Sequence, residues 1–233
     1  SSDIGTIPGR CRRGIRRWVG IFGLVLFPCF FGVGWAHGPQ HEQILEIDAQ
    51  IARQPDNAEL LLRRADLYRL DGDEDRALAD LDAAEKLSPS LEGIGWVRAR
   101  VFLNRAQPAA ALPHLNRWLE IHPRHESALA ARALAREQTG DPAGAVEDYS
   151  RAIGATQAPT PDLFLARARA QRRVGPESLQ EALRGLDEGI GQTGSLVVLQ
   201  MEAMNLEMAL GRTEEALARL DSVLRHAARK ESW

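Results

Sequence analysis

Cysteine and lysine are scarce in this 233-residue chain, and no strand-like pattern is evident. The two cysteines, Cys11 and Cys29, both lie within the first 36 residues, so residues 37–233 need no disulfide even in an oxidising compartment. Lysine occurs only as Lys86 and Lys230, so nearly every basic residue is an arginine. No Ser-His-Asp, Cys-His or metalloprotease spacing occurs, which argues against an enzyme.

The first 36 residues differ in chemistry from the rest. Five arginines between positions 10 and 17 precede an apolar run over 19–35, and Gly34 and Ala36 place small residues before a cut after Ala36. A basic stretch, an apolar core and a small-residue cleavage site are typical of a secretory signal peptide. We therefore expect a periplasmic or secreted protein. The alternative is an uncleaved membrane anchor that leaves the chain facing the extracytoplasmic side, which would be its only membrane contact.

The charge balance argues against nucleic-acid binding. Without the five arginines and one aspartate of residues 1–36, 24 basic and 31 acidic residues remain, a net charge of −7. A nucleic-acid-binding protein gains its affinity from basic residues that meet phosphates.

A 34-residue period organises the remainder. Pro55, Pro89 and Pro123 follow this spacing, and each closes a helical segment. Two series of alanines keep the same period: Ala65, Ala99, Ala133 and Ala168; and Ala77, Ala111, Ala145, Ala182 and Ala216. Repetition at this period is typical of a helix–turn–helix solenoid, in which each repeat buries its apolar face on its neighbours.

The apolar spacing predicts a lone helix over 41–54, followed by five helix pairs. Their ranges are 58–71 with 74–87, 92–105 with 108–121, 126–139 with 142–155, 161–174 with 178–190, and 196–210 with 213–228. Asp141 is predicted to cap a helix whose first residue is Pro142. The Asp and Glu residues are expected on exposed helix faces.

At these positions the chain resembles the tetratricopeptide repeat family. The match is close in the first repeat, where Ala65 fills a small position, Tyr68 an aromatic one, Gly72 the turn and Pro89 the end of the unit. The resemblance implies an all-α, right-handed superhelical solenoid that acts as a non-enzymatic scaffold. We divide the chain into residues 1–36, a capping half-repeat over 37–55, and five repeats in 56–233, at about 56–89, 90–123, 124–160, 161–194 and 195–228.

Three features depart from the repeat pattern. Trp118 stands where the neighbouring repeats have Ala84 and Ala152, so local packing must differ there. The fourth repeat has about two extra residues after Gly175, and the fifth puts Met204 in the small position. The segment 189–194 has the letters G-x-G-x-x-G, but no strand precedes it, so we interpret it as a linker between repeats and not as a dinucleotide site.

In the family, the first helices of successive repeats line a concave groove that binds a peptide or protein. The resemblance places these residues in the groove: Leu62, Asp66, Arg69, Trp96, Arg100, Leu103, Leu134, Glu137, Leu165, Arg169, Arg172, Met201, Asn205 and Met208. We expect Trp96 as an aromatic anchor and Arg69, Arg100, Arg169 and Arg172 as carboxylate partners. The alternative is an ordinary solvated face.

One further hypothesis concerns a metal. Cleavage after Ala36 would make His37 the new N-terminus, with its α-amine and imidazole free to bind one ion and His41 close in sequence. Three nitrogen ligands suit Cu(II), and the arrangement resembles the histidine brace of exported copper proteins. The alternatives are a linker histidine with no ligand role and a protein without any cofactor.

Overall fold

The computed structural model describes the backbone of residues 39–194 and 196–230, and the side chains of 40–194 and 196–225. Within these ranges the protein is all helical, with eleven α-helices and one short 3₁₀ helix, η1 (Pro176–Ser178). The helices are α1 (Pro39–Arg53), α2 (Ala58–Asp71), α3 (Glu74–Leu87), α4 (Ile94–Asn104), α5 (Pro108–Ile121), α6 (Glu126–Gln138), α7 (Pro142–Ala155), α8 (Pro161–Val174), α9 (Leu179–Thr193), α10 (Val197–Ala209) and α11 (Thr213–Lys230). Each predicted helix begins and ends within three residues of these bounds.

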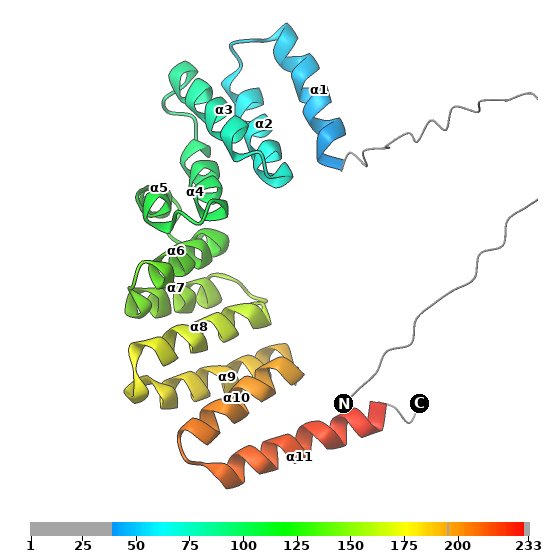
Figure 1. Ribbon diagram of the computed structural model, residues 1–233, viewed down its shortest axis with the longest axis vertical. Coiled ribbons are helices and arrows are strands. Elements are labelled where there is room, and N and C mark those ends of the chain that lie inside the picture. The colour runs from blue at the N-terminus through cyan, green and yellow to red at the C-terminus, as the bar shows by residue number, and fades with distance from the viewer. Residues whose placement is uncertain (1–38, 195, 231–233) are drawn as a thin grey trace, which may run out of the picture. The chain divides into compact units, whose positions relative to one another are not determined.

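The helices stack in chain order. Each α-helix packs on the next one, and the first helices of neighbouring repeats also meet, as in α2 with α4 and α8 with α10 (Figure 1). This arrangement is a solenoid of helix–turn–helix repeats, so the fold expected from the 34-residue period is confirmed.

Local signals in the sequence fix the helix ends. Asn57 begins the first repeat by accepting hydrogen bonds from the backbone N–H groups of Glu59 and Leu60. Gly72 ends α2 at φ 81°, a left-handed conformation that glycine adopts without a Cβ clash. Asp141 accepts a 2.8 Å hydrogen bond from the Gly144 N–H ahead of Pro142, so it is the predicted cap of α7.

The two alanine series lie where helices cross. Ala65, Ala99, Ala133 and Ala168 are at most 1% exposed, and Ala77, Ala111, Ala145 and Ala182 are fully buried. A small side chain at a crossing lets two helix backbones approach closely. The alanines that repeat about every 34 residues therefore mark the positions where helices pack closely.

At one layer of the core, the first helix of a repeat usually carries a large residue and the second helix a small one, and the second repeat reverses this. Leu61 and Leu129 face Ala84 and Ala152 in register, whereas the second repeat has Gly95 with Trp118. The fourth repeat reverses the exchange: a Cβ on Gly189 would lie 2.6 Å from the Phe164 ring. The predicted local difference at Trp118 is thus a volume swap, and Gly189 belongs to helix α9 and not to a linker.

The buried apolar residues form three clusters, and the smallest involves the second repeat. One apolar cluster joins α1 to α4, and a larger one spans α5 to α10. Between them lies a small cluster of Ala99, Ala111, Leu115 and Ala135. The smallest of the three clusters of buried apolar residues therefore lies at α4, α5 and α6.

A second, polar layer runs through the stack, and we call it the arginine ladder: Arg64, Arg98, Arg132 and Arg167, at spacings of 34, 34 and 35 residues. Each lies in the first helix of its repeat. Arg64 shows the full pattern, with two 2.7 Å hydrogen bonds to Asp80 of its own repeat and one of 2.6 Å to Asp48 of the preceding helix α1. The hydrogen bonds to Asp80 raise the pKa of Arg64, so the guanidinium stays charged.

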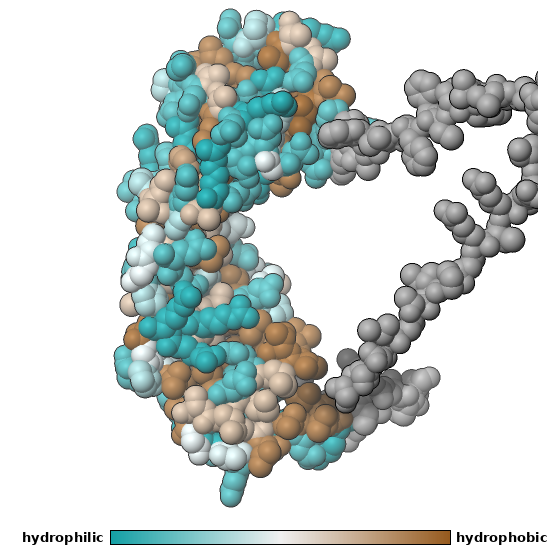
Figure 2. Space-filling model, in the orientation of Figure 1, coloured by the Kyte–Doolittle hydropathy of each residue, from teal (hydrophilic) through white to brown (hydrophobic). Residues whose placement is uncertain are grey.

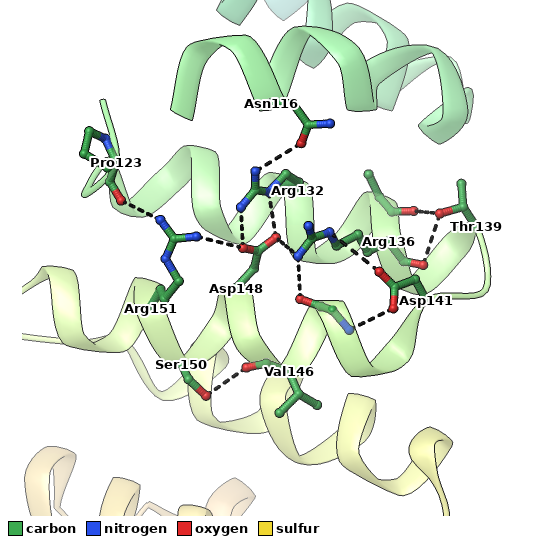
Figure 3. A network of polar contacts seen from close by, with 12 residues as sticks. Asn116, Pro123, Arg132, Arg136, Thr139, Asp141, Val146, Asp148, Ser150 and Arg151 are labelled. Carbon is green, nitrogen blue, oxygen red and sulfur yellow. Dashed lines mark hydrogen bonds and ion pairs between the residues drawn. The ribbon is translucent and has the colours of Figure 1, made fainter. Parts of the chain in front are cut away.

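The third repeat holds the most buried part of the ladder (Figure 3). Asp148 is 0% exposed and accepts hydrogen bonds of 2.8 and 2.7 Å from Arg132, with Arg136 at 2.9 Å. Arg132 also reaches Asn116 of the preceding repeat at 3.0 Å. The expectation that the Asp and Glu residues lie on exposed faces is therefore wrong for Asp80 and Asp148. Both carboxylates are buried because arginine side chains pair with them.

Candidate partner-binding surface

Arg69, one of the predicted carboxylate partners, is buried. Its side chain on α2 is 7% exposed, and its Nε lies 2.7 Å from Asp66 Oδ1. Arg100 on α4 approaches the same oxygen at 3.2 Å. Both cations therefore share the single carboxylate of Asp66, and the buried Arg69 has little surface to offer a partner.

Trp96, the predicted anchor, is half-buried in a cluster of rings. Its ring stacks on Trp118 of α5 at 6.1 Å and contacts His125 at the start of α6 at 5.1 Å. The Arg100 guanidinium lies over the Trp96 ring at 5.4 Å. Burial lowers the pKa of Arg100, nearby Asp66 raises it, and Arg69 lowers it again. Trp96 and Arg100 thus form one rigid unit on α4.

The first helices also border a cleft of about 650 Å³ at α1, α2 and α4. Leu62 and Asp66, both predicted to face the groove, line it together with Ile47 of α1 and Val97 of α4. Its charged lining residues are Glu46, Arg63 and Asp66, so this cleft carries no excess of positive charge.

A second cleft, of about 570 Å³, lies on α6 and α8, and we call it the basic cleft. Its lining is Leu134, Glu137, Gln138, Arg169, Arg172 and Arg173. Arg172 pairs with Glu202 of α10 at 2.8 Å, and its side chain remains 47% exposed. Arg173 lies 3.6 Å from Glu137. Arg169 is exposed and makes no ion pair or hydrogen bond with any of the described residues.

Glu137 fixes the acidic side of the basic cleft. Its side chain is 11% exposed and accepts a 2.9 Å hydrogen bond from the Tyr149 hydroxyl. Burial raises the pKa of Tyr149, and the Glu137 charge raises it further, so the hydroxyl stays a donor. Glu137 is therefore held in place, whereas Arg169 is free to meet a ligand.

In the fifth repeat the small position is Ala203 and not Met204. Ala203 is 0% exposed, whereas Met204 is half-buried. A shift of one residue turns the helix by about 100°, so the predicted groove set of Met201, Asn205 and Met208 belongs to a neighbouring face. Met201 and Met208 are exposed there.

Exposed apolar residues gather near α10. Leu196, Val197 and Val198 lie at its start, and apolar residues are visible around this region in Figure 2. Most of the remaining surface in that view is hydrophilic.

The predicted binding residues fall into two groups. Arg69 and Arg100 both contact Asp66, with the Trp96 ring beside Arg100, and Arg169 and Arg172 share α8 in the basic cleft. His41 is the third residue of α1, and His37 lies outside the described residues. Among the described side chains, those of residues 40–194 and 196–225, no three His, Cys, Asp or Glu form a metal-binding group. Nor does any helix there have the length and apolarity that a membrane crossing requires.

A tetratricopeptide repeat family model matches residues 46–92 and 97–160. The chain is a tetratricopeptide repeat protein. The family model stops at residue 160, but the helix pairs α8–α9 and α10–α11 continue the same packing. No curated protein sequence matches the chain.

Solved structures of tetratricopeptide repeat proteins share the fold at low sequence identity. The C-terminal part of a repeat-containing protein from Cytophaga hutchinsonii has a TM-score of 0.71 at 12% identity, over 82% of this chain and 75% of that one. YrrB, described as having an unusual peptide-binding site, gives 0.64 at 18% identity, over 75% and 89%. MamA from Desulfovibrio magneticus RS-1 gives 0.61 at 18% identity, over 69% and 89%.

Proposed function

We propose that this tetratricopeptide repeat protein is an exported scaffold that binds an acidic peptide or protein segment in the basic cleft. One observation carries the proposal. Arg169 is exposed and without a partner among the described residues, and it lines the cleft with Arg172 and Arg173, for each of which the described residues supply one acidic neighbour.

The chemistry of the cleft favours a carboxylate. Arginine presents a planar fork of donors that pairs with a carboxylate through two hydrogen bonds. Leu134 is 43% exposed beside these cations, so an apolar side chain of the ligand gains contact there. The peptide-binding site named for YrrB supports a peptide as ligand, since that protein has the same fold.

Trp96 and Arg100 are proposed as a second contact of the same partner. Their stacked arrangement is held by Trp118 and Asp66, so little side-chain entropy is lost when a ligand packs on it. Arg69 then acts by holding Asp66 and not by direct contact.

Export is supported by the leader. Residues 10–17 are arginine-rich, residues 19–35 are apolar, and small residues at 34 and 36 precede the proposed cleavage point. The absence of cysteine from residues 37–233 is compatible with an oxidising compartment.

Peptide binding tests the proposal. A fluorescein-labelled peptide containing Glu and Leu is titrated with the protein and followed by anisotropy, beside the same peptide with every Glu replaced by Gln. We expect the Glu peptide to bind more tightly, and Arg169→Ala to weaken it about tenfold, the loss of a hydrogen bond to a charged group.

The matched control is Arg53→Ala, which removes another exposed arginine without a described partner, at the end of α1. This variant should bind as the wild type does. Affinity for the Glu peptide should also fall as salt rises, because exposed charges are screened. Equal affinity for the Glu and Gln peptides, or equal loss in both arginine variants, refutes the basic cleft as the binding site.

A further inference from the structure

The second repeat contains a pocket of about 430 Å³ that the repeat pattern does not predict. It lies between residues 89–93, the first turn of α4 and helix α5. Three departures from the pattern line it together: Gly95 where other repeats have Leu or Phe, Trp118 where the first, third and fourth repeats have Ala or Gly, and His114 where two others have Asp. Departures from local consistency are expected at functional sites.

Gly95 leaves space that the chain itself does not fill. A Cβ at this position would meet nothing within 4 Å, so neither close packing nor backbone conformation demands glycine in the helix. Glycine inside a helix destabilises it relative to alanine. Retaining the empty space therefore calls for a reason outside the packing of this chain.

His114 leaves part of the arginine ladder without an acceptor. It stands 16 residues after Arg98, where Asp80 and Asp148 stand after Arg64 and Arg132. Arg98 donates through its terminal nitrogens to Asp82 at 2.9 Å and lies 3.0 Å from Glu85, but its buried Nε has no hydrogen-bond partner among the described residues. Burial lowers the pKa of His114, and Arg98 lowers it further, so the imidazole stays neutral.

Unused donors surround this pocket, and its two acidic residues, Glu85 and Glu92, lie beside Arg98 and His122. Trp118 Nε1 is also buried without a described acceptor. Helix α4 starts at Gly93 with no side-chain cap, so its first N–H groups and the positive end of the helix dipole face this end of the pocket. Arg117 is exposed with no described partner. Glu92 lies 2.5 Å from His122 Nε2.

The apolar residues that line the pocket favour a ligand with an apolar body. Ile94 and Ile121 line the pocket with the Trp118 ring. A cavity with an apolar wall and a few convergent polar groups is the usual form of a small-molecule site.

The geometry points to a binding site for a small monocarboxylate with an apolar body, held in the second repeat. Its carboxylate meets Arg117 and the start of α4, and a shift of the Trp118 side chain toward Gly95 opens the buried donors to it. The site shares no lining residue with the basic cleft, but its Trp118 also stacks on Trp96 of the proposed second peptide contact.

Isothermal titration calorimetry with phenylacetate tests the site, with phenylacetamide as the neutral isostere and tryptophan fluorescence as a second readout. We expect phenylacetate to bind and to change the fluorescence, and phenylacetamide to bind about tenfold more weakly. Arg117→Gln should weaken phenylacetate to a similar extent. Arg169→Ala should leave it unchanged, which separates this site from the basic cleft.

Gly95→Leu should fill the space and abolish binding while the helical circular dichroism is kept. Gly154→Leu is the control, because Gly154 is also a helical glycine whose Cβ position is open. Absence of phenylacetate binding to the wild type overturns the inference. So does equal binding of acid and amide, or undiminished binding to a folded Gly95→Leu variant.

Discussion

Replacing Asp148 with asparagine is the sharpest test of what holds the stack together. The carboxylate is fully buried and lies within 2.9 Å of nitrogens from both Arg132 and Arg136, with Arg151 at 3.7 Å. Asparagine keeps the shape of the side chain. It removes the negative charge and turns one acceptor oxygen into a donor that faces arginine donors.

The expected cost is large because the partners stay behind. Removing one member of a buried ion pair costs about 3–5 kcal/mol, since an uncompensated charge remains inside the protein. Arg132 is 11% exposed and cannot turn into water without breaking its contact with Asn116. Arg151 is 41% exposed and can recover solvation, so we place the cost near the lower end, about 3 kcal/mol.

Urea unfolding followed by circular dichroism measures the change, with Asp82→Asn as the control. Asp82 pairs with Arg98 at 2.9 Å, but its side chain is 60% exposed, so its loss should cost at most about 1 kcal/mol. A double-mutant cycle of Asp148→Asn with Arg132→Gln should show strong coupling. If Asp148→Asn and Asp82→Asn destabilise the protein equally, the buried ladder is not a main source of stability.

Three further predictions concern other parts of the chain. Ala111→Trp should lower the free energy of unfolding by about 1–3 kcal/mol or more through overpacking, because Ala111 is 0% exposed; an unchanged urea midpoint would contradict this. Because burial and Arg98 depress the pKa of folded His114 below 6.5, the unfolded state binds the proton more tightly; stability should fall as pH drops below about 6.5, and His114→Gln should remove this part of the dependence. If the exported protein begins at His37, as its intact mass would show, Cu(II) affinity should fall in His41→Ala; retention of residues 1–36 would remove the copper hypothesis.

The fold could be predicted from the sequence because its signals are local and repeated. Alanine recurs at helix crossings, and proline or glycine recurs at turns, so each repeat confirms the phase of the next. The two extra residues after Gly175 are accommodated as the turn η1, without loss of the packing of α8 on α9.

The arginine ladder could have been predicted from the sequence, but the charged residues were expected on exposed faces. In the first three repeats its signal is an arginine every 34 residues with Asp or Asn 16 residues before or after it, as Asp48 and Asp80 stand around Arg64. Arg167 lacks this spacing and pairs with Glu188 instead. Charged residues on helices are mostly solvated, which made exposed faces the natural expectation. Only the period distinguishes these buried charges from the others.

The binding surface could be predicted less well, because groove residues follow register and not composition. In the first three repeats the two small positions are 12 residues apart, and in the fifth repeat Met204 lies 12 residues before Ala216. The buried residue is nevertheless Ala203. A single residue between α10 and α11 changes the face of the helix that neighbours meet. Register places both Arg69 and Arg169 in the groove, so it could not show that Arg69 is buried against Asp66 while Arg169 is free.

The second repeat contributes to the smallest apolar cluster and also carries three departures from the repeat pattern, Gly95, His114 and Trp118. In a solenoid, stability is a sum over repeats and their interfaces, and the smallest apolar cluster lies at α4, α5 and α6. The volume swap of Gly95 and Trp118 moves bulk from the first helix to the second and leaves the pocket at this point. A ligand that binds only the folded repeat stabilises it by mass action. Opening of the stack between its two larger apolar clusters should therefore depend on ligand concentration, and amide exchange in α4 and α5 should report it first.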